Sequence, residues 1–244
     1  MNYFAHRGLF DNERDYPENT LAAFSRAVEA GYGVELDVRL TKDDKLVVAH
    51  DTGLRRICGK DVAIRDMTYE ELSQCHVLGS SQTIPLFGDV LDVIGGRVPL
   101  IVEIKAERNP LKSSRLTDEA LSSYPGTYCI ESFDPRVLVW YRAHRPSVIR
   151  GQLSNDFSHS PGTGIRALDA MLSAMLFNPL TWPDFIAYGW VYARKPSVRF
   201  WHAILRCPLV AWNITSQQAL DEAKQGFDAY IFDSFTPEGT NRHR

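Results

Sequence analysis

Eight short, strongly apolar runs recur along the whole chain, and they constrain its fold more than any other feature. They are rich in β-branched and aromatic residues. Continuous runs of this kind are typical of strands buried on both faces, as in parallel sheets. The runs lie at residues 3–6, 34–40, 98–104, 128–132, 148–153, 185–190, 209–214 and 229–232.

Helical patterns separate these runs. The clearest one follows the first run: Asn19 or Thr20 caps it, an apolar stripe continues to Val28, and Gly31 ends it. Strand and helix alternate to the end of the 244 residues, and eight repeats in a chain of this length predict a closed (β/α)8 barrel, the TIM barrel. Because no linker rich in Pro, Gly or Ser divides the chain, we expect a single domain over residues 1–244.

One stretch breaks the alternation. A further apolar run follows the second barrel strand after only a short polar turn, so the two runs are expected to form an antiparallel hairpin. A turn centred between Asp43 and Asp44 places His50 roughly opposite Asp37. We expect this insertion, at about 45–85, to cover the mouth of the barrel.

Composition narrows the class of protein. With 44% hydrophobic and 23% charged residues and a net charge of −3, the chain is typical of soluble globular proteins. No nucleic-acid partner is expected, because such proteins need a dense basic face to neutralise phosphates. A homo-oligomer is left open.

Two further observations bear on location. The four cysteines lie far apart and form no metal-binding or disulfide pattern, which predicts reduced, mostly buried thiols. No apolar run approaches the roughly 18 residues of a membrane span, and the first ten residues lack a signal-peptide pattern. We therefore expect a cytoplasmic location and no stable membrane anchoring.

Three carboxylates are expected at the active end of the barrel. Barrel enzymes work at the C-terminal ends of their strands, where Glu35 and Asp37 lie on the second strand and Glu103 on the third. Such a cluster resists ionisation unless a cation neutralises it, and all-oxygen ligands favour one Mg²⁺ or Ca²⁺ ion. In the structural alternative, Glu103 pairs with Lys105 and the other two carboxylates form local salt bridges.

Two histidines and two cations complete the set. His6 ends the first strand and His50 ends the hairpin, and both suit proton transfer to and from a phosphodiester. Arg7 offers a planar fork for phosphate oxygens, and Lys105 a compact positive charge. Taken singly, each histidine has a structural alternative as a hydrogen-bonded residue at a strand end, and Arg7 has one as a surface ion pair.

The polar residues at the start of the first helix are further candidates. Capping of the helix is a sufficient role for at least one of Glu18, Asn19 and Thr20. We nevertheless expect Asn19 or Glu18 also to form hydrogen bonds within the site.

Taken together, these motifs resemble a known family. Their order and spacing are similar to those of the glycerophosphodiester phosphodiesterase family. The motifs are His6-Arg7-Gly8, Pro17-Glu18-Asn19-Thr20, Glu35-x-Asp37-Val38, Val48-x-His50-Asp51 and Glu103-Ile104-Lys105. Later segments, among them Ser132-Phe133-Asp134-Pro135, resemble short bacterial members, so the likeness covers nearly the whole chain.

The resemblance implies a reaction and a set of roles. The reaction is metal-dependent hydrolysis of a small-molecule glycerophosphodiester to glycerol 3-phosphate and an alcohol, a step of lipid and glycerol metabolism. The implied roles are metal ligation by Glu35, Asp37 and Glu103, acid/base catalysis by His6 and His50, phosphate binding by Arg7 and Lys105, and further substrate contacts by Asn19, Phe133 and Trp212.

Two departures from the family pattern concern the substrate. The seventh strand reads Trp212-Asn213-Ile214-Thr215 where many members have Trp-Thr-Val-Asn, and the eighth ends in Phe232-Asp233-Ser234-Phe235 rather than Thr-Asp-x-Pro. Two other functions stay open. A lysophospholipase D would use the apolar stripe at 170–190 as a trough rather than as helix core, and a silent barrel would have lost a metal ligand or a histidine, although none is lost here.

Overall fold

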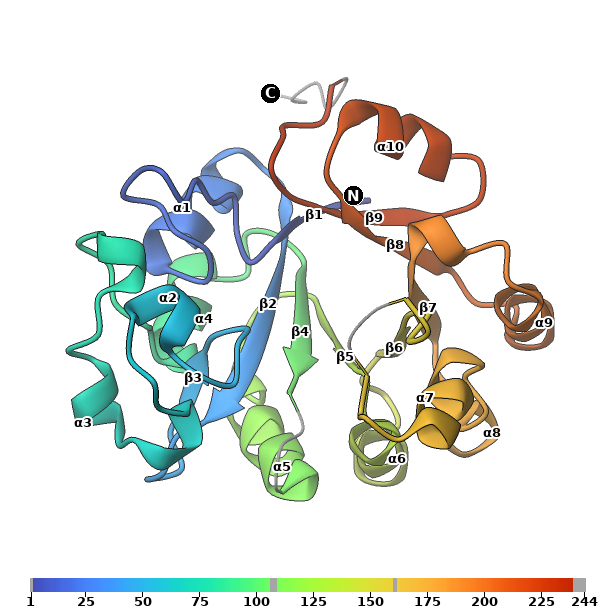
Figure 1. The fold of residues 1–244 in the computed structure, drawn as a ribbon, viewed down its shortest axis with the longest axis horizontal. Helices are drawn as coiled ribbons and strands as arrows, with labels where there is room; N and C mark the ends of the chain where they lie inside the picture. Colours follow the sequence, from blue (N-terminus) through green and yellow to red (C-terminus); the bar gives the residue numbers. More distant parts are fainter. Residues whose placement is uncertain (1, 106–108, 160–161, 239–244) are drawn as a thin grey trace.

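The chain forms a closed barrel of parallel strands in its computed structural model, which describes residues 2–105, 109–159 and 162–238 (Figure 1). The eight barrel strands are β1 (Tyr3–His6), β2 (Gly33–Leu40), β4 (Leu100–Ile104), β5 (Tyr128–Ser132), β6 (Arg150–Ser154), β7 (Phe185–Gly189), β8 (Leu209–Ile214) and β9 (Ala229–Phe232). Their order is β1-β9-β8-β7-β6-β5-β4-β2, and the pairing of β1 with β2 closes the barrel. The predicted (β/α)8 barrel is confirmed, and each predicted run overlaps one strand.

Helices cover the outside of the barrel (Figure 1). They are α1 (Leu21–Glu29), α4 (Phe87–Ile94), α5 (Pro110–Leu121), α6 (Pro135–His144), α7 (Arg166–Ser173), α8 (Asn178–Thr181), α9 (Pro196–Leu205) and α10 (Gln217–Ala223). Thr20 caps α1, since its hydroxyl accepts a hydrogen bond from the backbone N of Ala23. The predicted helix after the first strand is confirmed.

Two helices differ from expectation. The apolar pattern in the sequence indicates a helix at 116–123, but α5 begins earlier, at Pro110, because Asn109 caps it and proline suits the first helical position. Before the seventh barrel strand, where α9 lies, the sequence shows no clear helical pattern. On α9, Val198 and Trp201 are buried, but Phe200 and Ile204 are apolar and exposed, so apolar residues on the outer side obscure the stripe that reveals an amphipathic helix in a sequence.

The hairpin forms, but its register differs by one residue from the prediction. β3 (Leu46–Val48) pairs antiparallel with β2. Ala49 rather than His50 lies opposite Asp37, and the backbone N of Ala49 donates to the carbonyl oxygen of Asp37 over 3.0 Å. The turn has three residues rather than two, since Thr41 pairs with Lys45. Asp44 at its end takes a left-handed φ of 61°, which is typical of three-residue hairpin turns.

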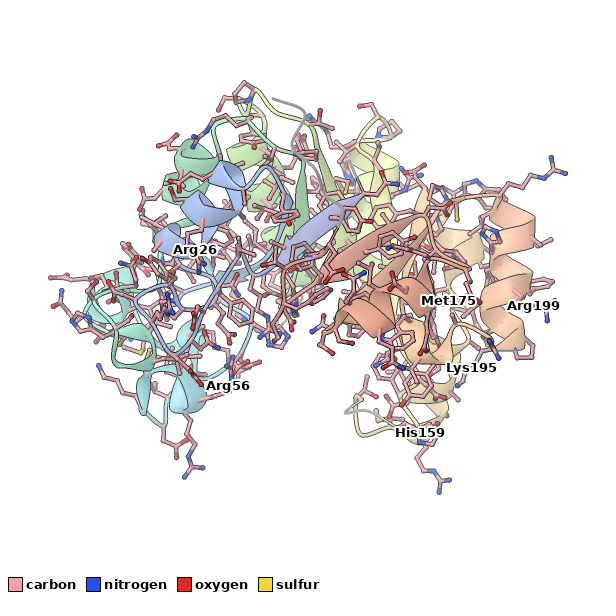
Figure 2. The ribbon with its side chains drawn as sticks, turned by 90° about the horizontal axis from the view of Figure 1, so that it is seen from above. Arg26, Arg56, His159, Met175, Lys195 and Arg199 are labelled. Carbon is pink, nitrogen blue, oxygen red and sulfur yellow. The ribbon has the colours of Figure 1, made fainter. Side chains whose placement is uncertain are left out.

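The insertion after β3 has an apolar core of its own. It contains α2 (Arg55–Cys58) and α3 (Tyr69–Leu72), together with the 3₁₀ turns η1 (Ile64–Asp66) and η2 (Val77–Gly79). The insertion stands at one side of the barrel (Figures 1 and 2). Among its described residues only His50 lines the central pocket, so the insertion flanks the mouth rather than covering it. Its core is built from Val47, Ala49, Leu54, Ile57, Ile64, Leu72, Cys75, Val77 and Ile84.

The apolar stripe at 170–190 is neither helix core nor a trough at the mouth. Of its apolar residues before β7, Met175 is buried, whereas Leu180 and Trp182 are 62% and 50% exposed. The backbone carbonyl of Trp182 accepts a hydrogen bond from Arg150, the first residue of β6. Leu180 and Trp182 therefore lie by the N-terminal end of the strands, away from the catalytic mouth.

Successive side chains on a strand face alternately the helices and the barrel interior, and this separates the apolar core from the polar site. On β2, Leu36 and Val38 face the helices and belong to the large apolar cluster between sheet and helices. Glu35 and Asp37 face the interior of the barrel. A second apolar cluster fills that interior below them, and the carboxylates thus lie above an apolar floor. Its buried members are Ile101, Leu153, Phe185, Ala187, Val210 and Ile231.

Two sequence expectations concern the chain as a whole. In the described part of the chain, no helix is long and apolar enough to cross a membrane, and the cytoplasmic location stays a prediction. All four cysteines are free thiols, of which Cys75 and Cys207 are buried and Cys58 and Cys129 half-buried.

The turn after β1 depends on a glycine. Gly8 has a φ of +83°, and an added Cβ would lie 2.8 Å from the carbonyl carbon of Ala23. Gly31 has a similar φ of +74°, but nothing lies within 4 Å of an added Cβ. Gly31→Ala should lower the free energy of unfolding by about 1–2 kcal/mol, the cost of a left-handed alanine. Gly8→Ala should lower it by about 1–3 kcal/mol more, through overpacking.

Denaturant unfolding of the two variants and the wild type measures this difference, with Gly31→Ala as the matched control. Equal losses in the two variants would show that the contact with α1 does not constrain the turn.

Candidate active site

The loop after β1 brings two side chains to the site through unusual backbone conformations. Arg7 and Asn19 have positive φ values of 57° and 56°, which are uncommon outside glycine. The backbone N of Asn19 donates to the carbonyl of Arg7 over 2.9 Å, and the backbone N of Arg7 donates to Glu35 Oε2 over 3.2 Å. Such conformations persist only where surrounding contacts hold them, and here they turn both side chains toward Asp37.

Three carboxylates meet at the C-terminal ends of β2 and β4. Glu35, Asp37 and Glu103 are all buried, and each offers an oxygen within 4.8 Å of the others. Burial, together with neighbouring carboxylates, raises the pKa of Glu35 well above its usual range and that of Glu103 to about 7. Burial opposes ionisation of Asp37 as well, but Lys105, His50 and Arg7 together hold its pKa well below the usual range.

Lys105 neutralises only part of this cluster. Its Nζ lies 2.6 Å from Glu103 Oε2 and 3.0 Å from Asp37 Oδ1, so the pairing with Glu103 considered as the structural alternative does occur. Among the described residues no lysine or arginine side chain forms an ion pair with Glu35, and burial together with Asp37 raises its pKa. Three buried carboxylates with converging oxygens are the donor set of a hard divalent cation, so the residues fit a metal site.

His6 is held by a carboxylate from the last strand. Its Nδ1 lies 2.7 Å from Oδ2 of Asp233, which also accepts a hydrogen bond from Asn213 Nδ2 over 2.8 Å. Its Nε2 faces Glu35 Oε2 at 3.9 Å. The carboxylate partner favours a proton on Nδ1, which leaves Nε2 to take up or release a proton toward the pocket. Burial lowers the pKa of His6, so the neutral imidazole is favoured near pH 7.

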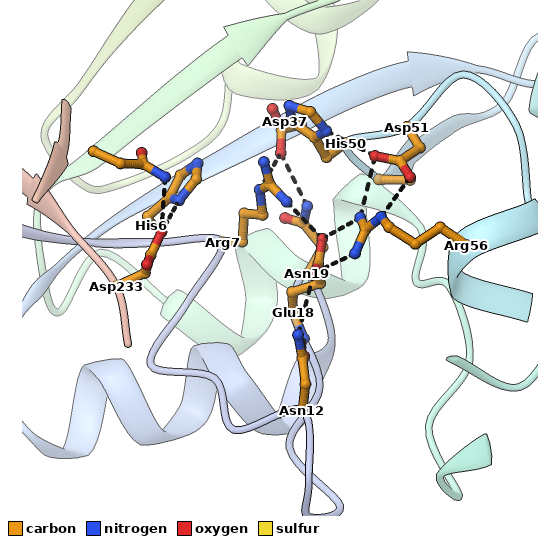
Figure 3. A network of polar contacts seen from close by, with 12 residues as sticks. His6, Arg7, Asn12, Glu18, Asn19, Asp37, His50, Asp51, Arg56 and Asp233 are labelled. Carbon is orange, nitrogen blue, oxygen red and sulfur yellow. Dashed lines mark hydrogen bonds and ion pairs between the residues drawn. The ribbon is translucent and has the colours of Figure 1, made fainter. Parts of the chain in front are cut away.

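His50 has the same arrangement with a different carboxylate (Figure 3). Its Nδ1 lies 2.8 Å from Oδ1 of Asp51, and burial lowers its pKa. Its side chain is 37% exposed against 12% for His6, so the two histidines stand at the outer and inner sides of the site. Both are therefore placed to move protons at the same pocket.

Arg56 of the insertion joins the two halves of the site (Figure 3). Its Nε donates to Asp51 Oδ2 over 2.7 Å, and its two terminal nitrogens donate to the Glu18 carboxylate over 2.8 and 2.7 Å. Glu18 in turn accepts from Arg7 over 2.7 Å. These two arginines outweigh burial and lower the pKa of Glu18 to about 2. One guanidinium thus connects the carboxylate that orients His50 with the carboxylate that holds Arg7.

The pocket at the mouth gathers most of the predicted residues. It has a volume of about 80 Å³, and Leu153 and Ile231 belong to its floor. Two predicted residues lie behind its surface: Asp37, and Asn19, whose Nδ2 donates to Asp37 Oδ2 over 2.9 Å. Asn19 therefore supports a carboxylate of the cluster. The predicted residues that line the pocket are His6, Arg7, Glu35, His50, Glu103, Lys105, Phe133 and Trp212.

Sequence reasoning missed four polar residues of the site. Asp233 and Asn213 were noticed only as departures from a family pattern, and Arg56 stands in an insertion whose surface charges have no evident pattern. Glu131 lines the pocket as well. Glu131 lies directly beside Glu103 on the neighbouring strand β5. Aligning the two predicted strands in the sequence would have placed both glutamates at the same height in the barrel.

A barrel that carries paired histidines, a carboxylate cluster and two cations at its C-terminal mouth is a phosphoester hydrolase. The sequence profile described as the glycerophosphoryl diester phosphodiesterase family matches residues 6–171. A glycerophosphodiester phosphodiesterase of Bacillus altitudinis is 30% identical over 179 residues, which cover 68% of this chain and 72% of that protein. The chain belongs to the glycerophosphoryl diester phosphodiesterase family and is an enzyme of that class.

Other relatives match over less of their length or less closely. A human lysophospholipase D is 34% identical over 122 residues, which cover 45% of this chain and 38% of that protein. A Thermotoga maritima glycerophosphodiester phosphodiesterase has 25% identity and a TM-score of 0.72, covering 95% and 94% of the two chains. An Oleispira antarctica phosphodiesterase, solved with its product sn-glycerol-3-phosphate, shares the fold with a TM-score of 0.76 at 24% identity, covering 96% and 92%.

Loss of the Arg56 guanidinium should disorient His50 and Arg7 without removing either. For Arg56→Ala we expect kcat to fall about 10–100-fold, as is usual when a residue that orients site groups is lost. Arg56→Lys should recover part of that loss, because a single ammonium can bind only one of the two carboxylates well.

Steady-state kinetics on a phosphodiester measure this effect. Arg55→Ala, on the same short helix and exposed, is the matched control and should stay within about twofold of wild type. Wild-type kcat in a folded Arg56→Ala protein would show that the network does not position the site.

Proposed function

We propose that the chain, acting over 1–244 as one catalytic domain, hydrolyses glycerophosphodiesters to glycerol 3-phosphate and an alcohol with the help of one Mg²⁺ or Ca²⁺ ion. One observation carries the proposal. Two histidines, each with Nδ1 on a carboxylate, flank a cluster of three carboxylates and two cations in a single pocket. Phosphodiester cleavage needs these groups together: a base, an acid and positive charge for the phosphate oxygens.

Glu35, Asp37 and Glu103 would hold the cation. When bound, a divalent cation polarises a phosphoryl oxygen and neutralises the charge that develops on it. Arg7 contributes a fork of donors for the remaining phosphate oxygens, and Glu18 holds that fork in place. Lys105 contributes a charge fixed between Asp37 and Glu103.

We assign His6 as the base and His50 as the acid. His6 is the more buried of the two, and its Nε2 is directed to the pocket while Asp233 holds Nδ1. It can take the proton of the attacking hydroxyl, which belongs either to water or to the C2 hydroxyl of the glycerol moiety. His50 stands at the more exposed side, where it can protonate the alcohol that departs to solvent.

A lysophospholipase D reaction is the second candidate. Phe133 forms ring contacts at 5.8 Å with Phe157 and at 5.7 Å with Trp212. Phe133 and Trp212 line the pocket, so this aromatic group offers apolar surface beside the site for an acyl chain. The human relative named lysophospholipase D is 34% identical to this chain over 122 residues.

Release of glycerol 3-phosphate from glycerophosphoethanolamine, with and without EDTA, tests the proposal. We expect EDTA to abolish turnover and Mg²⁺ or Ca²⁺ to restore it. His6→Ala and Glu35→Ala should each lower kcat by at least about 100-fold, the usual share of general acid–base or charge stabilisation. Glu119→Ala, at an exposed ion pair on α5, is the control and should retain wild-type activity.

Full activity in EDTA or in either site variant would contradict the proposed mechanism, and an inactive wild type would favour a silent barrel. Repeating the assay with lysophosphatidylethanolamine separates the two enzyme functions, since a lysophospholipase D should turn over the acylated substrate faster.

A further inference from the structure

Glu131 is a buried carboxyl group that the proposed mechanism does not use. β5 places it directly beside Glu103, and its side chain is 1% exposed. Its Oε2 has no hydrogen-bond partner among the described residues, yet the residue lines the site pocket. A buried polar oxygen without a partner is costly, so a group that binds in the pocket is the natural partner for it.

The carboxylate cluster does not account for this residue. Glu35, Asp37 and Glu103 bring oxygens within 4.8 Å of one another, and Glu131 is not among the described residues that meet in that group. The cations that suit phosphate oxygens, Arg7 and Lys105, pair with Glu18, Asp37 and Glu103, and in the described part of the chain neither forms an ion pair with Glu131.

Two more residues that line the same pocket carry unpartnered polar atoms. Trp212 Nε1 and Asn213 Oδ1, both on β8, are buried and have no hydrogen-bond partner in the described part of the chain. The groups that suit metal and phosphate come from β1, β2, β4 and the hairpin, whereas these three atoms come from β5 and β8. The pocket thus has a second wall with two acceptors and one donor.

We propose that Glu131 and Asn213, with Trp212, bind the free hydroxyls of the glycerol moiety and thereby select glycerol-containing diesters. Hydroxyl groups can donate to the two acceptor oxygens and accept from the indole N–H. A neutral, compact polyol also suits a pocket of about 80 Å³ with an apolar floor. The inference rests on the proposed function, since it names how that substrate class would be recognised.

A cationic head group is the competing ligand for Glu131. The ammonium of ethanolamine would satisfy a carboxyl group but not the indole N–H of Trp212, which needs an acceptor. An enzyme that accepts several alcohols must also hold the part that its substrates share, and that part is the glycerol. Glycerol hydroxyls therefore match all three atoms, whereas an ammonium matches only the acceptors.

The test compares three substrates in wild type, Glu131→Leu and Glu131→Gln. Glycerophosphoethanolamine and glycerophosphoglycerol share the glycerol moiety but differ in the charge of the alcohol, and bis-para-nitrophenyl phosphate lacks glycerol. We expect Glu131→Leu to lower kcat/KM for both glycerol diesters about 10–100-fold, as when a buried hydrogen-bond partner is removed, and to leave the nitrophenyl diester within about twofold. Glu131→Gln, which keeps an acceptor oxygen, should recover part of the loss.

Two further measurements keep the outcomes distinct. Calorimetric titration with Ca²⁺ should give the same affinity in Glu131→Gln as in wild type, and thermal unfolding shows that the variants are folded. Glu119→Leu, an exposed glutamate on α5, is the control and should resemble wild type on all three substrates.

Three results would overturn the inference. Equal losses on all three substrates with weaker Ca²⁺ binding would place Glu131 in the metal site. A loss confined to glycerophosphoethanolamine would assign it to the cationic head group, and wild-type kinetics in both variants would leave it no role in recognition. A wild-type enzyme that cleaves neither glycerol diester would instead contradict the proposed function itself.

Discussion

Repulsion among buried carboxylates is the constraint on which the rest of this structure depends. Glu35, Asp37 and Glu103 are brought together by a parallel pairing of β2 with β4 that sets Asp37 directly beside Glu103. In a buried site, like charges at this range cannot all ionise without compensation. Lys105 and Arg7 supply part of that compensation, and a divalent cation fits the remainder. A bound cation would act with Arg7 and Lys105 to attract the oxygens of an anionic phosphodiester.

Closure of the barrel brings the two histidines beside this cluster. β1 lies between β9 and β2, so His6 stands between Asp233, which follows β9, and Glu35 on β2. The hairpin and the insertion complete the opposite side through His50, Asp51 and Arg56 (Figure 3). The proposed acid/base groups therefore depend on contacts between segments far apart in the chain, and the site forms only when the first and last strands pair.

The sequence predicts those features of the structure that depend on residues close together in the chain. Continuous apolar runs mark the strands because both of their faces are buried, and alternation places Glu35 and Asp37 on one side of β2. The predicted register of the hairpin was wrong by one residue, because the true register depends on the left-handed conformation of Asp44. An aspartate in the sequence does not by itself indicate that conformation. Arg56, Asp233 and Glu131 were missed because their roles arise from partners 38, 227 and 28 residues away.

Thermal unfolding with and without a divalent cation tests the central claim most directly, because it reads the carboxylate repulsion without any substrate. In EDTA, Glu35→Gln should unfold at a higher temperature than wild type, since it removes one buried carboxylate and keeps the acceptor for the backbone N of Arg7. Saturating Mg²⁺ or Ca²⁺ should raise the Tm of wild type by several degrees, roughly 2–4 °C per kcal/mol of binding free energy, and leave Glu35→Gln nearly unchanged. A wild-type Tm that no divalent cation changes, or a variant less stable than wild type in EDTA, would contradict the account.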